Sequence, residues 1–579
     1  MFLKLNKSGG RLYAQLAESY RDDQGRPRNR VIATLGRVDR ADSNLESVLN
    51  GLLRATGRGT ADAVPTVQFE QSLAFGDVWV LHQLWHQLGL DRLGELFRGR
   101  REHRTELLLR LMVFNRLCDP GSKLGVLRWM QTAAIPELPA PGDITHAQLL
   151  RAMDDWEAIE PKVHAHLASL LLPLIDTELS VVFYDVTTVG VCGESVLPGD
   201  VRAYGRSKRD TIERQFALGL VQTADGLPIA YEVFEGNVAE TATLMPMVHR
   251  VLQRYAISRV VLVADRGLLS MDNLEQIQAL RLPSGKPMEF VLAVPARRYA
   301  EFAPLISSMG PGATATATAA QWVDERPWSP GDEGDAPPAT ALRLVVAHDA
   351  QQAALATERR LAKIAELQAL AERWSGKLDA QDAGAKPRGR RLSDKGATAR
   401  MYHAVAQERL STVLRVDLKG SLFSYTIDEA MLQRLQSLDG KLVLLSNVRD
   451  LGAAALVERY KSLADIERGF RVLKSDIEIG PVYHRLPQRI RAHAGICFLA
   501  LVLHRVMRMR LRQAGNEHSP TSALQLLGRL QQHHVALNGL RPVRGLGRID
   551  TLQQRLFSAL GIPQPHTEQV QHEQLSLPL

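Results

Sequence analysis

One stretch of the chain, residues 181–188, constrains the fold most, because it combines the composition of a core strand with a single carboxylate. Its residues are β-branched or aromatic on both sides of Asp185, which is typical of a buried strand. A charge in such a strand is costly unless it is paired or holds a metal. An Asp at a strand end, bonded to a loop amide, is the simplest interpretation. Partner carboxylates elsewhere in the chain would favour a shared site.

Two further carboxylates occur in compatible settings. Residues 260–264 form a second apolar strand that is followed directly by Asp265. Glu467 lies in a helix predicted over residues 454–474. At about 100° per residue, one face of that helix collects Tyr460, Glu467, Arg471 and Lys474. A solvated, salt-bridged face would explain these charges alone, but not why the chain also carries two acid-bearing strands.

Composition is compatible with a nucleic-acid partner and does not require one. The 579 residues carry a net charge of +8, and the basic residues are clustered, which suits a phosphate backbone or serves solubility. The three cysteines are far apart, so neither a disulfide framework nor a zinc site is expected. No signal-peptide core is present, and the longest apolar run, residues 494–503, is too short to span a bilayer. We therefore expect a cytoplasmic protein.

The chain order predicts a mixed α/β protein of six segments. Residues 1–65 read as an N-terminal β unit, with strands at 11–16 and 31–35, and a linker. Residues 66–175 are helical, and form either a DNA-binding domain or a simple bundle. The other segments are a core first part (176–295), an insertion domain (296–440), a core second part with the Glu467 helix (441–512) and a C-terminal tail (513–579).

The first core segment has a recognisable order of elements. The Asp185 strand is followed by a hairpin of residues 216–221 and 228–234, then by a helix over 245–255 and the Asp265 strand. Three antiparallel strands, a helix and a fourth, acid-bearing strand are the order of an RNase H-like α/β core. We expect this catalytic core to be interrupted by the insertion domain.

Three carboxylates from two strands and one helix can hold two divalent metal ions. Mg²⁺ prefers oxygen ligands and keeps room for water and phosphate oxygens, and Mn²⁺ can take its place. Two such ions, roughly 4 Å apart, activate an attacking oxygen and stabilise the leaving oxygen of a phosphoryl displacement. Asp185, Asp265 and Glu467 are therefore the candidate catalytic and metal-binding residues.

Across nearly its whole length the chain resembles the DDE transposases of the IS4 superfamily, most closely the IS1634 type. The motifs that carry the resemblance are residues 184–188, 205–210, 226–237 and 264–267 and the Glu467 helix. The resemblance implies that Asp185, Asp265 and Glu467 bind two Mg²⁺ ions. It also implies an enzyme of an insertion sequence that cleaves DNA at the ends of its element and transfers the freed 3′ hydroxyls into target DNA.

The superfamily signature on the Glu helix is Tyr, two residues, Arg, three residues, Glu, six residues, Lys. Tyr460, Glu467 and Lys474 fit it, whereas Leu463 stands where the signature has Arg. We hypothesise that Arg471 supplies the missing DNA contact. The predicted DNA-binding residues are Tyr460, Arg471 and Lys474 together with Lys208 and Arg209 of a basic loop. Trp322, Trp328 and Trp374 could stack on a displaced base, but core packing is the favoured role.

The last six residues, 574–579, resemble the short peptide with which bacterial proteins dock on the replication sliding clamp. Leu577 and Leu579 would enter an apolar pocket, and Gln574 and Leu575 would complete the contact. A chance match is the alternative, because short motifs recur by chance.

Two other functions stay open from the sequence. A metal-dependent nuclease with the same core would cut DNA without joining it. A domesticated relic of a transposase would only bind DNA, although such a protein would have no use for three intact acids. The resemblance further implies DNA partners, namely the terminal inverted repeats and the target, and a homodimer on DNA.

Overall fold

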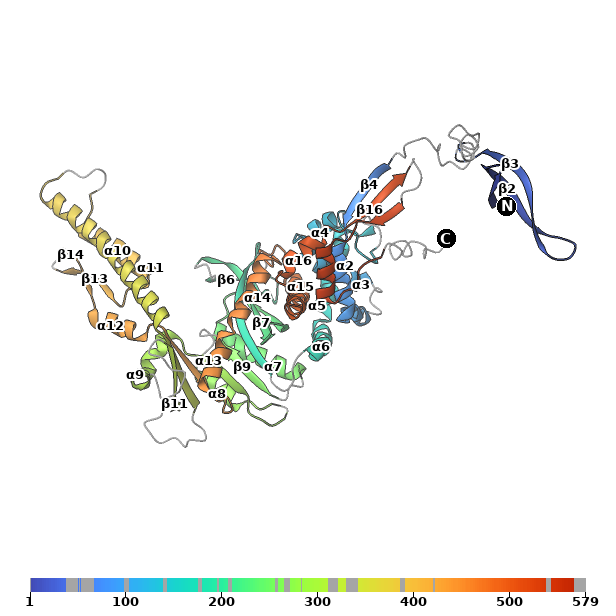
Figure 1. The fold of residues 1–579 in the computed structure, drawn as a ribbon. Coiled ribbons are helices and arrows are strands. Elements are labelled where there is room, and N and C mark those ends of the chain that lie inside the picture. The colour runs from blue at the N-terminus through green and yellow to red at the C-terminus, as the bar shows by residue number, and fades with distance from the viewer. Residues whose placement is uncertain are drawn as a thin grey trace. The chain divides into compact units, whose positions relative to one another are not determined.

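The fold was analysed in a computed structural model, shown in Figure 1. The structure describes residues 2–37, 50, 53, 67–97, 104–138, 143–174, 180–194, 197–206, 211–255, 259–264, 271–282, 284–310, 321–329, 342–385, 391–419, 422–537 and 543–566, without the side chains of residues 180–183, 206, 271, 297, 300, 419, 464–467 and 537. Two compact units divide the chain, and each is considered by itself. The first consists of residues 1–94, 101–152 and 506–579, and the second of residues 95–100 and 153–505.

An antiparallel sheet of three strands begins the chain: β1 (Phe2–Ser8), β2 (Arg11–Arg21) and β3 (Pro27–Arg37) (Figure 1). The β1–β2 hairpin turns at Gly9 and Gly10, whose φ angles of 58° and 74° require glycine-like freedom. In the second turn, Asp22 Oδ1 accepts hydrogen bonds from the backbone amides of Gln24 and Arg26. The predicted strands at 11–16 and 31–35 are confirmed as parts of β2 and β3, whereas β1 was not predicted.

Helices dominate the rest of the first unit. The elements before residue 152 are β4 (Val67–Ala74), α2 (Gly76–Gln87), η1 (Leu90–Phe97, which reaches the unit boundary), α3 (Arg104–Cys118), α4 (Lys123–Trp129) and the start of α5 (His146–Ala158). Ser122 caps α4 by accepting from the amide of Gly125, which explains why the chain resumes a helix after the break at residues 119–121.

The end of the chain belongs to the same unit. It contributes α16 (Pro520–Leu527), β16 (Gln531–Leu537), β17 (Val543–Leu546) and α17 (Thr551–Leu560). β16 pairs with β4 and β17 in a three-stranded sheet, and α16 contacts α2. Residues 513–560 therefore add strands and core helices to this unit, where the sequence analysis expected only a C-terminal tail.

Residues 146–171, within the segment predicted to be helical, form two helices. α5 ends at Ala158, and α6 (Glu160–Leu171) begins after Ile159 and runs into the short turn η3 (Leu172–Leu174). Pro161 lies in the first turn of α6, where a backbone amide has no partner within the helix, so its missing amide hydrogen is tolerated. If α5 and α6 were one continuous helix, the proline ring would clash with the backbone carbonyl four residues earlier.

A mixed sheet organises the second unit, and nine of the described strands belong to it. β5 (Ser180–Gly190) pairs antiparallel with β7 (Ile212–Thr223), which pairs antiparallel with both β6 (Ala203–Arg206) and β8 (Pro228–Glu235). On the other side, β9 (Val260–Ala264) is parallel to β5, and β10 (Glu289–Ala293) is parallel to β9. This arrangement confirms the predicted hairpin as β7 and β8, and the strand predicted before Asp265 as β9.

The sheet extends beyond β10 with strands from both sides of the predicted insertion. β15 (Lys441–Ser446) pairs with β10, β12 (Leu342–Asp349) pairs with β15, and β11 (Gln321–Trp328) forms the edge, all antiparallel. Between β10 and β11 the chain forms η5 (Ala296–Phe302) and α9 (Ala303–Ser308). Part of segment 296–440 is thus continuous with the sheet of the core.

The residues between β12 and β15 form a small α/β module with a core of its own. Its elements are α10 (Ala350–Asp382), α11 (Asp394–Gln407), β13 (Leu414–Lys419), β14 (Leu422–Ile427) and α12 (Glu429–Leu438). Leu367, Met401, Val413 and Leu432 are buried together in its centre. This module is the yellow and light orange part of Figure 1.

Helices cover the sheet of the second unit. Tyr184 and Val221 of the sheet line an apolar cavity together with Met247 and Val251 of α7 (Glu240–Arg254), so α7 covers that face. α8 (Met271–Ala279) contacts α7. α15 (Pro487–Gln513) is the one described helix that is long and apolar enough to cross a membrane, and 94% of its apolar window is buried, as in the core helix of a globular protein.

Candidate active site

Asp185 lies in the middle of β5, next to the strand whose end precedes Asp265. Its neighbours Tyr184 and Val186 are 1% and 3% exposed and point to the face covered by α7, so Asp185 points to the opposite face. The Asp185 side chain is half-buried, and its Oδ1 accepts a hydrogen bond of 2.7 Å from the amide of Val186. A half-buried carboxylate in a sheet strand is a setting in which a cation would be stabilised.

Tyr184, by contrast, belongs to the core. Burial raises the pKa of its hydroxyl well above the ordinary value, so the side chain stays neutral at any physiological pH. A Cβ atom on Gly219 would lie 2.8 Å from the Tyr184 hydroxyl, which shows how closely β7 passes the ring. Tyr184 therefore fixes the strand from one face while Asp185 is presented on the other.

The helix that carries Glu467 is shorter than predicted. The single helix predicted over residues 454–474 is wrong, because the chain forms α13 (Ala453–Lys461) and α14 (Ala464–Ser475). At the break, the Ser462 hydroxyl donates to the carbonyls of Glu458 and Arg459 at 3.1 and 2.9 Å, and the Leu463 amide donates to Tyr460 in a tight turn. A serine that bonds to preceding carbonyls competes with the regular helix pattern. Tyr460 therefore lies on a different helix from Glu467.

α14 lies on the face of the sheet that carries Asp185. Asp185 pairs with Leu220 of β7, and Gln222 lies two residues further along β7, so the Gln222 side chain points to the same face as Asp185, away from α7. A Cβ atom on Gly469 of α14 would lie only 2.3 Å from Gln222 Nε2 and 3.2 Å from Arg505 Nη2. The glycine thus allows α14 to pass directly over β7, and α14 also contacts β5.

Gln222, Gly469 and Arg505 are positioning residues that sequence reasoning missed. Gln222 is fully buried and Arg505 of α15 is 2% exposed, so neither can move away easily. They come from three distant parts of the chain, and no spacing in the sequence connects them. A Gln facing the core from an otherwise apolar strand was the only local signal.

Of the predicted DNA-binding residues, the structure describes Tyr460, Arg471 and Lys474. Arg471 and Lys474 are exposed on α14. Tyr460 is half-buried and lines a groove of about 1320 Å³ together with Trp322, His348 and Lys441. Leu463, at the position where the signature has Arg, is 8% exposed and packs inward. Trp322 is 7% exposed, and the Trp328 ring lies 5.2 Å from that of Phe302, so both have the predicted packing role.

Several predicted site residues lie outside the described residues. They are Asp265, Lys208 and Arg209 and the clamp-type residues Gln574, Leu575, Leu577 and Leu579. The backbone of Glu467 is described within α14, whereas its side chain is not. Of the predicted acidic triad, the structure therefore describes the Asp185 carboxylate and the helix that bears Glu467.

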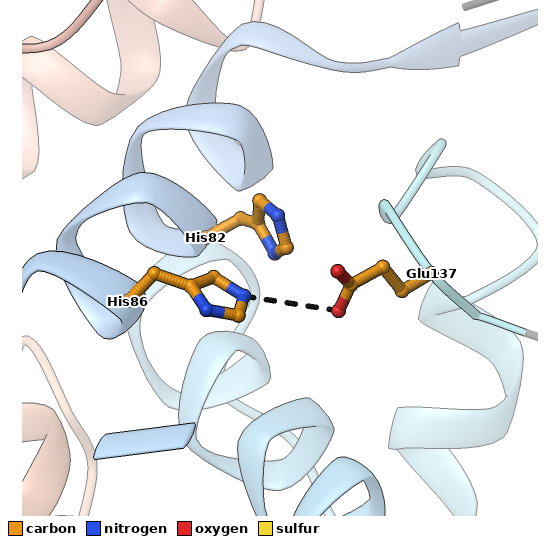
Figure 2. A group of neighbouring side chains, drawn as sticks. All are labelled: His82, His86 and Glu137. Atoms are coloured by element: carbon orange, nitrogen blue, oxygen red, sulfur yellow. Dashed lines mark ion pairs between the residues drawn. The ribbon is translucent and has the colours of Figure 1, made fainter. Parts of the chain in front are cut away.

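The first unit contains a separate cluster that sequence reasoning also missed. His82 and His86, one turn apart on α2, face Glu137 from the segment after α4 (Figure 2). Their ligand atoms lie within 4.8 Å of one another, as a metal site would require. However, Arg110 Nη1 lies 3.2 Å from His82 Nδ1, 3.2 Å from His86 Nε2 and 2.9 Å from Glu137 Oε2. The guanidinium fills the centre of the cluster and would repel a cation, so we assign the cluster to structural hydrogen bonding.

This cluster predicts a pH dependence of the first unit. Burial, assisted by the charge of Arg110 and opposed by that of Glu137, lowers the pKa of His82 from 6.5 to about 4. Between these values the unfolded chain binds a proton that the folded chain does not, so stability is complete above pH 6.5 and falls as the pH drops to 4. The loss is roughly 3 kcal/mol at about 1.4 kcal/mol per pKa unit.

We expect His82→Gln to flatten this decline, as measured by the unfolding temperature in calorimetry between pH 7 and 4. His566→Gln, an exposed position of the same unit, is the matched control and should keep the steepness of the wild type. An unchanged slope in His82→Gln would show that other groups control the acid sensitivity.

Comparisons with known families agree with this architecture. Residues 176–503, more than half of the chain, match the family model described as "Transposase DDE domain". The chain therefore belongs to the DDE transposases, enzymes of phosphoryl transfer on DNA that generally use divalent metal ions. Residues 3–64 match the model "IS1634 family transposase, N-terminal domain". The protein is the transposase of an IS1634-family insertion sequence, as the sequence motifs predicted.

Other comparisons add little. No curated protein matches the chain. Among solved structures, the chain is similar to the cryo-EM structure of a piggyBac transposase synaptic complex with hairpin DNA, at 9% identity and a TM-score of 0.33, over 78% of this chain and 76% of that one. The DDE domain implies an RNase H-like core, and the mixed central sheet agrees with this fold class.

Proposed function

We propose that this transposase cleaves DNA at the terminal inverted repeats of its element and transfers the freed 3′ hydroxyls into target DNA, with Asp185, Asp265 and Glu467 as its catalytic residues. The observation that carries the proposal is the pairing of β5 with β9. The parallel register ends where Tyr184 of β5 lies opposite Ala264 of β9. Asp185 follows Tyr184 in the sequence, and Asp265 follows Ala264. Adjacent parallel strands are about 4.8 Å apart, so a register continued by one residue would bring both carboxylates to one metal site.

The placement of α14 supports Glu467 as the third member of the proposed acidic triad. α14 passes over β7 at Gly469, on the face to which Asp185 points. Glu467 belongs to the same helix. Because α14 lies on the face to which Asp185 points, a carboxylate from this helix can complete a site whose other ligands are Asp185, in the middle of β5, and Asp265, directly after β9.

The donor set fits divalent metal ions. Three carboxylates without histidine or thiolate match Mg²⁺ or Mn²⁺, which prefer oxygen ligands. Two bound Mg²⁺ ions would supply the activation of the attacking oxygen and the stabilisation of the leaving oxygen. The protein would hold the three carboxylates on one face of a rigid sheet, with Tyr184 packed on the opposite face. The RNase H-like core in this proposal is interrupted between β12 and β15 by the module of residues 350–438.

DNA near the cleaved end would contact α14 and its surroundings. Tyr460, Arg471 and Lys474, with Lys208 and Arg209, supply donors and positive charge for phosphates. Leu463 carries no charge and packs inward at 8% exposure, whereas Arg471 is exposed one turn after Glu467. This supports Arg471 as the replacement for the missing arginine.

Arg471→Ala is expected to lower end cleavage about tenfold or more, because a hydrogen bond to a charged group contributes about 1.5–3 kcal/mol. Single-turnover cleavage of a terminal-repeat duplex measures the effect. Arg468→Ala removes a neighbouring exposed arginine of the same helix and serves as the control. Equal cleavage by Arg471→Ala and the wild type would refute the replacement.

Further partners follow from the same proposal. The transposase would act in the cytoplasm as a homodimer that bridges two element ends. The peptide of residues 574–579 would recruit it to replicating DNA through the sliding clamp. Equal affinity for the clamp of the full chain and of a chain without residues 574–579 would remove that part of the proposal.

A cleavage and joining assay tests the function. A labelled duplex with the terminal repeat of the element is incubated with Mg²⁺ and target DNA, and the wild type is compared with Asp265→Ala. We expect cutting at the repeat and insertion products, both lost in Asp265→Ala. Cutting without joining would favour the nuclease, and tight binding without cutting would favour a DNA-binding relic.

A further inference from the structure

The sheet of residues 2–37 has two chemically different faces. Alternate residues of a strand point to the same side, and the register brings partners from neighbouring strands to that side. Gln15 pairs with Lys4 on β1 and with Thr34 on β3, and Tyr13 pairs with Asn6 and Arg37. We call this side the polar face; it is built mainly from Lys4, Asn6, Arg11, Gln15, Thr34 and Arg37.

Side-chain contacts agree with this assignment. Gln15 Nε2 donates to Thr34 Oγ1 at 3.4 Å across β2 and β3. On the same face, the Ser19 hydroxyl donates to Asn29 Oδ1 at 2.8 Å. The polar face thus presents amide and hydroxyl groups in rows across the three strands. Its apolar members, Phe2 and Val31, lie at one end, opposite Ala17.

The opposite side, here called the apolar face, has a different chemistry. Leu3 and Leu5 of β1 pair with Leu16 and Ala14 of β2, which makes a side suited to packing against protein. This face also carries three cations: Lys7 lies opposite Leu12, Arg30 forms an ion pair with Glu18, and Arg28 forms one with Asp22 of the turn at 3.1 Å.

Charge separates the two faces further. Residues 2–37, all of them described, contain eight Lys and Arg and three Asp and Glu, a net charge of +5. Lys4, Arg11, Arg21 and Arg37 lie on the polar face by strand alternation. Glu18 lies on the apolar face, and Asp22 and Asp23 lie in the turn. The polar face is therefore a positively charged surface with many hydrogen-bonding groups. Such a surface complements a duplex nucleic acid, a polyanion whose base edges carry hydrogen-bond donors and acceptors.

We propose that the polar face of this sheet binds duplex DNA in the major groove, as the module with which the transposase recognises its terminal repeat. The inference rests on the proposed function, because that function makes the element end the DNA in question. Three strands span roughly 10 Å between their outer axes, and the major groove is about 12 Å wide, so the sheet fits. Gln15 and Asn6 would offer bidentate amides to adenine, Arg37 would offer a guanidinium to guanine, and Lys4 and Arg11 would contact the phosphates that flank the groove.

The test compares matched pairs of cations on the two faces of the full-length protein. Binding to a fluorescein-labelled terminal-repeat duplex, and to a scrambled duplex of equal length, is followed by fluorescence anisotropy at several salt concentrations. Lys4→Ala/Arg11→Ala should weaken binding roughly tenfold or more and reduce the salt dependence by about 2 in log–log slope. Arg28→Ala/Arg30→Ala removes the same charge from the apolar face and should change the affinity less than about twofold.

A third variant separates recognition of the base sequence from electrostatic attraction to the DNA backbone. Gln15→Ala should lower the preference for the repeat over the scrambled duplex by roughly tenfold, because a bidentate base contact contributes about 1–3 kcal/mol of discrimination. Circular dichroism and thermal unfolding would establish that each variant is folded. Equal losses in the two double variants would reduce the effect to net charge and overturn the proposal, and wild-type binding by Lys4→Ala/Arg11→Ala would overturn it as well.

Failure of this inference and failure of the proposed function give different results. A protein that binds the repeat through the polar face but does not cut it with Mg²⁺ keeps the inference and loses the function. A protein that cuts the repeat, and whose Lys4→Ala/Arg11→Ala variant binds and cuts like the wild type, keeps the function and loses the inference.

Discussion

Asp185→Asn is expected to lower Mg²⁺-dependent cleavage and joining by at least about 10³-fold. The substitution keeps the size of the side chain and removes the charge that would hold the metal ions. Metal ions contribute several kcal/mol of transition-state stabilisation, and each 1.4 kcal/mol corresponds to about a tenfold change in rate. Single-turnover cleavage of the terminal-repeat duplex at saturating protein measures this loss.

A matched control distinguishes loss of the site from loss of the fold. Asp225→Asn makes the same chemical change at the exposed turn between β7 and β8 of the same sheet, and should cut at the rate of the wild type. Metal-free DNA binding by Asp185→Asn should be unchanged or tighter, because a negative charge near the phosphates is removed. Near-normal cleavage by Asp185→Asn would exclude the carboxylate from the catalytic site.

Gly469→Ala is expected to lower cleavage by about 10²-fold while the protein stays folded. The new Cβ would lie 2.3 Å from Gln222 Nε2, and Gln222 is fully buried beside Arg505. Overpacking of this kind costs about 1–3 kcal/mol and is relieved by a shift of the backbone. A shift of about 1 Å in the helix that bears Glu467 would misplace the carboxylate that we propose as a catalytic group, which can cost about 10²-fold in rate.

The clash also predicts a rescue. Gln222→Ala removes the atom that the new methyl group meets, so Gly469→Ala/Gln222→Ala should recover much of the lost cleavage. Gly376→Ala in α10 has nothing within 4 Å of its Cβ and is the control for a glycine replaced in a helix. If the double variant is as impaired as the sum of the two single variants, the two positions are not coupled and the close approach does not set the position of α14.

Local patterns predicted much of the core. The hairpin of β7 and β8 was found because two apolar runs flank Asp225 and Gly226. β5 and β9 were found because each is rich in β-branched residues and has an acid within it or directly after it. These signals lie within a few residues of one another. Asp185 and Asp265 were predicted as site residues because they lie in or beside these strands, whereas Glu467 was predicted from the face of its helix and from the family signature.

Long-range arrangements were beyond such patterns. The break between α13 and α14 depends on hydrogen bonds of Ser462, a residue that helices elsewhere tolerate. The approach of Gly469 to Gln222 joins residues that are 247 positions apart, and periodicity carries no information over that distance. β1 was missed because the alternation of Leu3 and Leu5 with Lys4 and Asn6 covers only four residues, which is a weak signal for a strand.

The junction between β12 and β15 affects how the 350–438 module can vary in evolution. His348 pairs with Lys441, and the Asp349 amide donates to the Gly440 carbonyl at 3.0 Å, so the 350–438 module leaves and re-enters the sheet at a single rung. Topologically the module is the loop of a β-hairpin, and its ends meet whatever its length. It can be lengthened, shortened or exchanged without altering the register of β5 and β9. Evolution can therefore vary this appendage independently of the strands that present the acids.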